Sequence, residues 1–251
     1  MKQIATIILA AGQGIRMKSD KPKVIFKLAG KPMINRVVET ANKINSDTVV
    51  IVVGYKKNLV TDIVPQKSKI IFVEQKEQNG TGHAVMMTED NFKNFNGDIF
   101  VLCGDVPLLR HQTLEKMLRH HRKLNASCTL LTAIMDDALR YGRILRNEND
   151  SIKKIVEFKD ATEAEKQIME INTGIYCFDA LSLFLALKRV NNNNIQKEYY
   201  LTDTVEIMKK EGKFVTSILL EDMIEASGVN SIEQLEKLES EYLKKADYYD
   251  K

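Results

Sequence analysis

The sequence predicts an α/β fold built on a mostly parallel central sheet, with a smaller mixed or antiparallel extension. Short runs such as Thr48–Val53 are rich in β-branched residues and lack the polar alternation of half-exposed strands, so both of their faces should be covered. Helical patterns separate these runs, which is typical of parallel strands joined by crossovers. After residue 124 the strand-like segments lie closer together, which favours antiparallel or mixed pairing.

The first half of the chain alternates strands with helices. Pro32 suits the first turn of a helix because its missing N–H would be unpaired there, and Gly54 ends the second strand. The expected strands are Ile4–Leu9, Thr48–Val53, Lys69–Val73 and Asp98–Leu102, and the expected helices are Pro32–Ile44, Lys56–Val64, Gly82–Phe92 and His111–Leu124.

The second half predicts more strands and a final helix. No linker rich in Pro, Gly or Ser divides the chain, so residues 1–251 are expected to form one domain with parts at 1–124, 125–230 and 231–251. The expected strands are Ser127–Ile134, Arg143–Arg146, Ile152–Phe158, Gly174–Phe178 and Phe214–Leu220. Residues Ser231–Lys245 predict an amphipathic helix, with Ile232, Leu235, Leu238, Tyr242 and Leu243 on one side.

Composition excludes several classes of protein. The 251 residues carry 37 Lys and Arg against 34 Asp and Glu, and a net charge of +3 argues against nucleic acid or a membrane as a partner. Three widely spaced cysteines without a C-x-x-C motif argue against a disulfide framework or a structural zinc site, so a reducing cytoplasm is expected. No apolar run approaches the roughly 20 residues of a membrane helix.

The predicted loop after the first strand has the composition of a phosphate-binding site. Gly12 and Gly14 allow the backbone to approach an anion and to aim its N–H groups inward. In open α/β sheets ligands bind beyond the carboxyl ends of the strands, where this loop lies. The plainer alternative is a turn with solvated lysines, but two glycines, an arginine and P-K together favour phosphate. The cations of this loop are Arg16, Lys18, Lys21 and Lys23.

Two common phosphate loops are excluded here. Met17 stands where the third glycine of the dinucleotide motif G-x-G-x-x-G should be, and also where the last glycine of the P-loop G-x-x-x-x-G-K-S should be. Pro22 would also interrupt the helix that a P-loop lysine begins.

Two further segments carry polar groups at the ends of predicted strands. Asp105 follows the strand Asp98–Leu102, and a carboxylate there suits Mg²⁺, although capping of the next turn is an equally good reading of Asp105 in isolation. Gly80 and Thr81 open a helix whose free N–H groups and hydroxyl could bind a polar ring or an anion; a simple N-cap is the alternative.

The loop G-x-G-x-R-M followed by P-K resembles the signature of the sugar-1-phosphate nucleotidyltransferases. The segment Glu74–Val85 resembles the Q-x-x-Q-x-G-T-G-H-A stretch of bacterial N-acetylglucosamine-1-phosphate uridyltransferases, and Val101–Leu109 resembles the G-D-x-P-L metal motif of the family. Further likenesses follow in order, at Tyr141–Arg146, Ile155–Thr162 and Glu170–Tyr176. The resemblance covers nearly the whole chain and implies a Rossmann-like, three-layer nucleotidyltransferase fold.

The resemblance implies a role for each matching residue. Residues 1–124 would bind the nucleotide, residues 125–230 the sugar, and 231–251 would form the C-terminal helix. Catalytic roles fall to Arg16 and Lys23, and Mg²⁺ would be held by Asp105 and Asn230. Nucleotide-binding residues would be Leu9, Ala10, Ala11, Gly12, Gly14, Lys23, Gln75, Gln78, Gly80, Thr81, Cys103, Gly104 and Asp105. Sugar-binding residues would be Gly142, Glu157, Asn172, Glu198, Tyr200 and Thr202.

The reaction implied is attack of N-acetylglucosamine 1-phosphate on the α-phosphorus of UTP, with release of pyrophosphate and formation of a precursor for cell-wall polymers. Relatives in the family have Tyr where Cys103 stands, and continue into a β-helical acetyltransferase that drives trimer formation. No hexapeptide repeat occurs in this sequence, so neither acetyl transfer nor a trimer is expected of it.

Two alternatives stay open at this point. One is a related enzyme with another sugar phosphate or base, such as a glucose-1-phosphate uridylyl- or thymidylyltransferase. The other is a non-catalytic regulator that binds sugar nucleotides. The four histidines are expected to have no catalytic role, and two of them, His120 and His121, are expected to be solvated.

Overall fold

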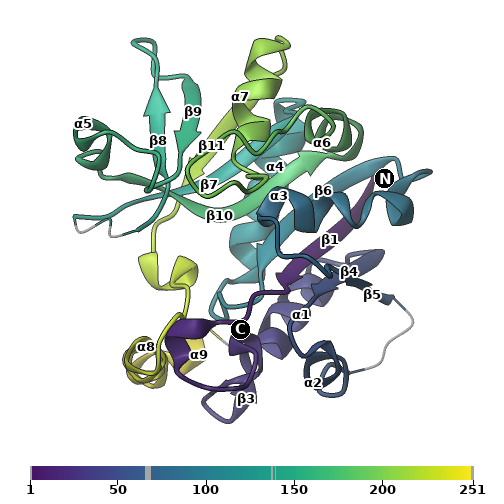
Figure 1. Ribbon diagram of the computed structural model, residues 1–251, viewed down its shortest axis with the longest axis vertical. Coiled ribbons are helices and arrows are strands. Elements are labelled where there is room, and N and C mark those ends of the chain that lie inside the picture. The colour runs from purple at the N-terminus through teal and green to yellow at the C-terminus, as the bar shows by residue number, and fades with distance from the viewer. Residues whose placement is uncertain (1, 66–68, 137, 139, 250–251) are drawn as a thin grey trace.

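The computed structural model describes residues 2–65, 69–136, 138 and 140–249. A nine-stranded sheet runs through the molecule in the order β11-β7-β10-β6-β1-β4-β5, with β8 and β9 attached beside β10 (Figure 1). The strands are β1 Gln3–Ala10, β4 Thr48–Val53, β5 Ile70–Glu74, β6 Gly97–Cys103, β7 Cys128–Ile134, β8 Arg143–Arg146, β9 Ile152–Val156, β10 Glu170–Asp179 and β11 Val215–Leu219.

The sheet is parallel on one side and mixed on the other. β1 pairs in parallel with β4 and β6, and β4 pairs in parallel with β5. β10 is antiparallel to both β6 and β7, while β11 is again parallel to β7. The predicted parallel sheet is confirmed. The predicted mixed extension is also confirmed: β7, β10 and β11 continue the central sheet with mixed pairing, and the β8–β9 hairpin projects from β10 (Figure 1).

Helices cover both faces of the sheet, as its apolar strands require. Successive residues of β1 enter opposite cores: Ile7 packs in the layer with α3, α6 and α7, and Ile8 packs in the layer with α1, α2 and α4. The helices are α1 Met33–Lys43, α2 Lys57–Thr61, α3 Thr81–Met86, α4 His111–Lys123, α5 Glu163–Lys166, α6 Ala180–Leu187 and α7 Asp203–Lys210.

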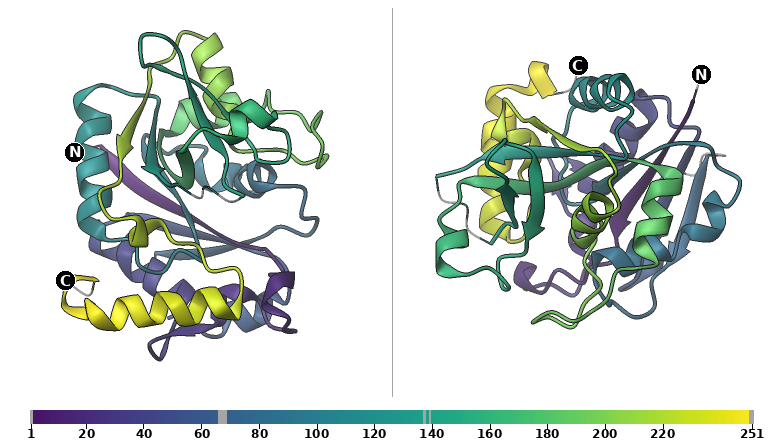
Figure 2. Two further views of the ribbon diagram at one scale, coloured as in Figure 1. Left: turned by 90° about the vertical axis from the view of Figure 1, so that its left-hand side faces the viewer. Right: turned by 90° about the horizontal axis from the view of Figure 1, so that it is seen from above.

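A third core lies under the last two helices, α8 Ile232–Lys244 and α9 Ala246–Tyr249. Leu235, Leu238 and Tyr242 of α8 pack with Met17 and Leu28, two residues of the segment between β1 and α1. Figure 2 shows the yellow C-terminal helix lying beside this purple segment. The end of the chain therefore closes over the segment that leaves the first strand. Ser231 caps α8 by accepting a hydrogen bond from the Gln234 N–H.

The predicted elements hold with shifts of a few residues at their ends, apart from three differences. Pro32 is the N-cap of α1 rather than part of its first turn, and it lies in a two-residue strand, β3, that pairs with β2 Lys27–Leu28. The expected helix Gly82–Phe92 breaks into α3 and a 3₁₀ turn, Glu89–Phe92. The strand expected at Gly174–Phe178 begins earlier, at Glu170.

One surface expectation is wrong, and one apolar stripe is only partly buried. His121 is only 1% exposed, because it lies on the sheet side of α4 and hydrogen-bonds Thr129 Oγ1 through Nδ1 at 2.9 Å; burial lowers its pKa to about 4. Ile232 and Leu243 of α8 are 37% and 65% exposed, because the buried stripe of this helix is narrower than its apolar pattern. In the described part of the chain, no helix has both the length and the apolarity needed to cross a bilayer.

Candidate functional site

The candidate site lies at the carboxyl ends of β1 and β6, the central strands of the sheet. The Gly104 N–H donates to Leu9 O at 2.9 Å, so the loops that follow the two strands leave the sheet side by side. The chain then forms two short 3₁₀ turns, Ile15–Met17 and Lys23–Ile25. Gly14 has a φ of 70°, and a Cβ at this position would lie 2.7 Å from the Lys23 Cβ, so the loop folds back on the lysine only because glycine stands there.

Three predicted residues from distant parts of the sequence meet at one point. The Lys23 ammonium donates to Asp105 Oδ2 and, at 2.8 Å, to Asn230 Oδ1. The Lys23 and Asp105 side chains are only 19% and 15% exposed, so this ion pair is partly shielded from water. A carboxylate oxygen and an amide oxygen therefore converge on a single positive charge.

Local hydrogen bonds hold this arrangement in place. The Val229 N–H donates to Asp105 O at 3.0 Å, which ties the segment before α8 to the end of β6. The Asn230 N–H donates to Gln234 Oε1 at 2.8 Å, which fixes the Asn230 backbone against the first turn of α8.

The two oxygens that accept hydrogen bonds from Lys23, those of Asp105 and Asn230, suit a hard divalent cation. Carboxylate and amide oxygens are its usual protein ligands, and Mg²⁺ takes the rest of its shell from water and phosphate. Among the described residues, no group of three or more His, Cys, Asp or Glu side chains is placed to hold a metal. A metal here would thus rely on Asp105 and Asn230 together with ligands from outside the chain.

A second loop packs beside the first and carries the residues predicted to bind the base. Gln78 Nε2 donates to Ala11 O at 2.8 Å, joining the two loops. Gln75 is 4% exposed, and its Nε2 lies 3.0 Å from both Gly80 O and His83 Nδ1. The Gln75 amide is thus held by its own loop.

The same loop is anchored to the segment before α7. The Leu201 N–H donates to Thr81 Oγ1 at 3.2 Å, and the Gly82 N–H donates to Tyr199 O at 2.8 Å. Gly80 has a φ of 104°, and a Cβ there would lie 2.6 Å from Tyr199 O. Gly80 thus sets how closely the loop approaches this segment.

Substituting Gly80 by alanine should distort this packing. We expect a free energy of unfolding lower by about 1–3 kcal/mol, from the positive φ and the clash together, and a weaker affinity for nucleotide. Urea unfolding and nucleotide titration would measure the two effects. The control is Gly212→Ala, because Gly212 also has a positive φ, 72°, but no atom within 4 Å of its added Cβ. Equal losses in both variants would contradict the packing role of Gly80.

Several predicted sugar-binding residues lie near a partly buried carboxylate, that of Glu157. Glu157 Oε1 accepts a hydrogen bond from Thr202 Oγ1 at 3.0 Å, and burial raises the pKa of Glu157. A Cβ on Gly142 would lie 3.6 Å from Glu157 Oε2. The Asn172 N–H donates to Gly142 O at 2.9 Å, so β10 positions the Gly142 backbone.

The remaining sugar-side residues are already bonded within the protein. Asn172 Nδ2 donates to Tyr176 Oη at 2.7 Å, and Tyr200 Oη donates to Asp160 Oδ2 at 3.0 Å. Tyr200 is 6% exposed, so it supports the segment rather than opening to solvent. Glu198 is partly buried, which raises its pKa. Asp160 and Gln196, which the sequence did not single out, both hydrogen-bond the Tyr200 hydroxyl.

A carboxylate next to this cluster makes stability depend on pH. Burial, Glu206 and Asp160 raise the pKa of Asp203 to about 6 from 3.8. A carboxyl group whose pKa is raised by folding stabilises the fold below its unfolded pKa, and that contribution is lost as the pH rises through about 6.

Asp203→Asn should therefore unfold at a higher temperature than the parent protein above pH 6 and at the same temperature below pH 4. Because Asp203 is partly exposed and begins a helix, screening and the helix dipole reduce the gain, which we expect to be about 2–4 °C in Tm. Thermal unfolding between pH 4 and pH 8 would measure it. A difference in Tm that does not change with pH would contradict the assignment to Asp203.

Cys103 ends β6 beside the site. Its thiol contacts Gly174 O at 3.6 Å, and burial raises the pKa of Cys103 to about 12. The side chain is therefore a neutral thiol that fills space between β6 and β10 and has no nucleophilic character at neutral pH.

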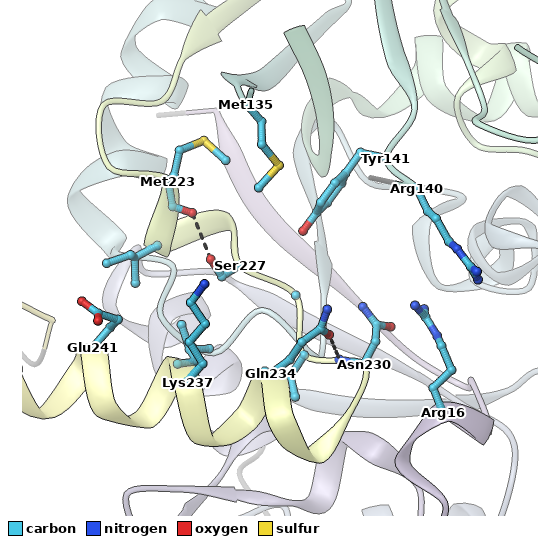
Figure 3. Close-up of a pocket in the computed structure, with 14 residues that line it drawn as sticks. Arg16, Met135, Arg140, Tyr141, Met223, Ser227, Asn230, Gln234, Lys237 and Glu241 are labelled. Atoms are coloured by element: carbon cyan, nitrogen blue, oxygen red, sulfur yellow. Dashed lines mark hydrogen bonds between the residues drawn. The ribbon is translucent and has the colours of Figure 1, made fainter. Parts of the chain in front are cut away.

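A cavity of about 510 Å³ opens from the metal end of the site, lined by Arg16, Arg140, Tyr141, Gly228, Asn230 and Gln234 among others (Figure 3). Tyr141 Oη accepts a hydrogen bond from the Gly228 N–H, and burial raises the pKa of Tyr141. Arg140 and Gln234 were missed from the sequence; the position of Arg140 immediately before the Y-G-R motif was the available signal.

The comparison with known proteins decides the family. Residues 5–226 match the nucleotidyl transferase family. The chain belongs to the nucleotidyl transferase family. The bifunctional protein GlmU of Oceanobacillus iheyensis is 44% identical over 224 residues, which cover 89% of this chain and 49% of that protein. The GlmU protein of Streptococcus mutans is 47% identical over 233 residues, covering 93% of this chain and 50% of that protein.

This nucleotidyl transferase chain spans about half the length of the relatives that it matches. Among solved structures, a UDP-glucose pyrophosphorylase complexed with UDP-glucose superposes with a TM-score of 0.73 at 21% identity, covering 98% of this chain and all of that one. An identity this low supports the shared fold alone. The predicted fold class is thereby confirmed.

Proposed function

We propose that this chain transfers a uridylyl group from UTP to N-acetyl-α-D-glucosamine 1-phosphate, giving UDP-N-acetylglucosamine and pyrophosphate, with Mg²⁺ as its metal. The observation that carries the proposal is the meeting of Lys23, Asp105 and Asn230 at the carboxyl ends of the central strands. A lysine, a carboxylate and an amide at one point suit phosphoryl chemistry, in which charge neutralisation and positioning do most of the work.

Each group of residues has a defined task in this proposal. The loop 9–16 binds the triphosphate, with Arg16 on the β- and γ-phosphates. The loop that carries Gln75, Gly80 and Thr81 binds uracil. Glu157 accepts hydrogen bonds from the sugar, and Asn172 donates hydrogen bonds to it. The sugar lies next to Gly142. The incoming phosphate is already anionic, so no general base is required.

Asp105 and Asn230 would hold Mg²⁺, which would neutralise phosphate charge when bound. With those oxygens engaged, Lys23 would leave them and bind the α-phosphate and the incoming phosphate. The lysine would then neutralise charge that develops during in-line displacement.

The test is pyrophosphate release from purified protein with UTP, N-acetylglucosamine 1-phosphate and Mg²⁺, with and without a chelator. We expect metal-dependent release together with UDP-N-acetylglucosamine. Release with glucose 1-phosphate or dTTP in place of these substrates would keep the reaction class and reject the specificity. Nucleotide binding with no turnover for any pair would favour the non-catalytic regulator instead.

A further inference from the structure

We propose that Arg140 is a second arginine for the departing pyrophosphate, completing with Arg16 a clamp on the β- and γ-phosphates. The inference rests on the proposed function, because it names a residue of that same site. Arg16 and Arg140 come from different segments, and their guanidinium groups point toward each other across the mouth of the 510 Å³ cavity (Figure 3).

The charge of this cavity favours an anion. Its lining holds three cations, Arg16, Arg140 and Lys237, against one carboxylate, Glu241, which also pairs with Lys244 at 2.7 Å. Among the residues that the structure describes, neither arginine forms an ion pair with a carboxylate. Two facing guanidinium groups repel each other, and an anion between them would relieve this repulsion while accepting bonds from both.

Hydrogen bonds hold Tyr141, the residue that follows Arg140, whereas the Arg140 side chain is exposed. Arg143 is 3% exposed, and its guanidinium donates to Tyr141 O and, at 3.2 Å, to Ala138 O. The Tyr141 side chain is held in turn by the Gly228 N–H. Arg140 therefore directly precedes a residue that is held in place beside the cavity.

Gly142 and Arg140 lie near different groups of the proposed reaction. Gly142 lies against Glu157 on the sugar side, whereas Arg140, two residues earlier, lines the cavity beside Asn230 and Arg16. In an in-line displacement the attacking and leaving oxygens lie on opposite sides of the phosphorus. If the sugar phosphate enters at Gly142, the leaving group must point toward the side of Arg140.

The experiment measures binding of inorganic pyrophosphate, with Mg²⁺ present, by titration calorimetry, which needs no turnover. We expect Arg140→Ala to weaken the affinity about five- to tenfold, since an exposed charged hydrogen bond is lost. Arg140→Lys should recover part of the loss, because a lysine keeps the charge but not the planar fork. Arg119→Ala is the control, since Arg119 lies on α4 and is 72% exposed.

A parallel steady-state assay should give a KM for the sugar phosphate within about twofold of the parent value in Arg140→Ala. The inference is overturned if the parent protein does not bind pyrophosphate, if Arg140→Ala binds it normally, or if Arg119→Ala loses as much. Weaker binding in Arg140→Ala without turnover for any substrate pair would support the clamp and reject the proposed function. Normal pyrophosphate binding by Arg140→Ala together with normal turnover would reject the clamp and support the proposed function.

Discussion

Lys23→Met is expected to lower kcat/KM for uridylyl transfer by about 10²–10³-fold, the usual effect of removing one charge-stabilising group from a reaction centre. Methionine keeps most of the aliphatic stem, which packs against Gly14, and removes only the ammonium. Steady-state kinetics with saturating Mg²⁺ would measure the loss. The matched control is Lys27→Met, since Lys27 is exposed on the short strand β2.

The same variant offers a readout that does not depend on turnover. In the parent protein the Lys23 ammonium lies between the Asp105 and Asn230 oxygens, so a divalent cation must displace it. Titration of Mg²⁺ without nucleotide should therefore show tighter binding to Lys23→Met than to the parent protein. Near-normal turnover in Lys23→Met would remove the lysine from the mechanism, and unchanged metal affinity would contradict a shared position.

Asp98→Ala is expected to lower the free energy of unfolding by about 2–3 kcal/mol, because two partly exposed cations, Lys2 and Arg122, lose the charged hydrogen bonds to a buried carboxylate. Asp98 is fully buried in β6, where it accepts bonds from Lys2 Nζ at 2.8 Å and Arg122 Nε at 2.6 Å. His121 Nε2 lies 3.7 Å away, and its lowered pKa keeps it neutral at pH 7. Asp98 thus ties the N-terminus and α4 to the sheet.

Urea unfolding at pH 7 would measure this loss of stability. The matched control is Asp90→Ala, because Asp90 also pairs with a lysine, Lys93 at 2.8 Å, but is 84% exposed. The control should keep its urea midpoint, since an ion pair in water contributes little. A similar shift in both variants would show that burial of Asp98 adds nothing.

The parallel half of the fold was predictable because its strands are short apolar runs between helices. The mixed half was harder to predict, because the position of β10 between β6 and β7 depends on pairing between strands distant in sequence. His121 was misplaced for a related reason. A polar residue such as His121 in a charged helix is expected to be solvated. Only the hydrogen bond from α4 to Thr129 shows that His121 is buried.

The candidate site was predictable where residues share a short motif. Gln78 meets Ala11, and Asn230 meets Lys23, so residues with related expected roles lie together, and the roles themselves stay predictions. Gln234 and Asp160 could not be found in this way, because Gln234 acquires its role from a turn of helix and Asp160 from Tyr200, which is distant in sequence. For Arg140 the only signal was its place immediately before the Y-G-R motif.

The position of β10 also affects how the chain is synthesised. β6 and β7 follow each other in the sequence but are not neighbours in the sheet; both pair with β10, which is made later. During synthesis on the ribosome, one edge of β6 therefore stays unpaired until β10, Glu170–Asp179, has emerged. An open apolar edge can pair with another chain, so during this interval the nascent protein is open to misassembly.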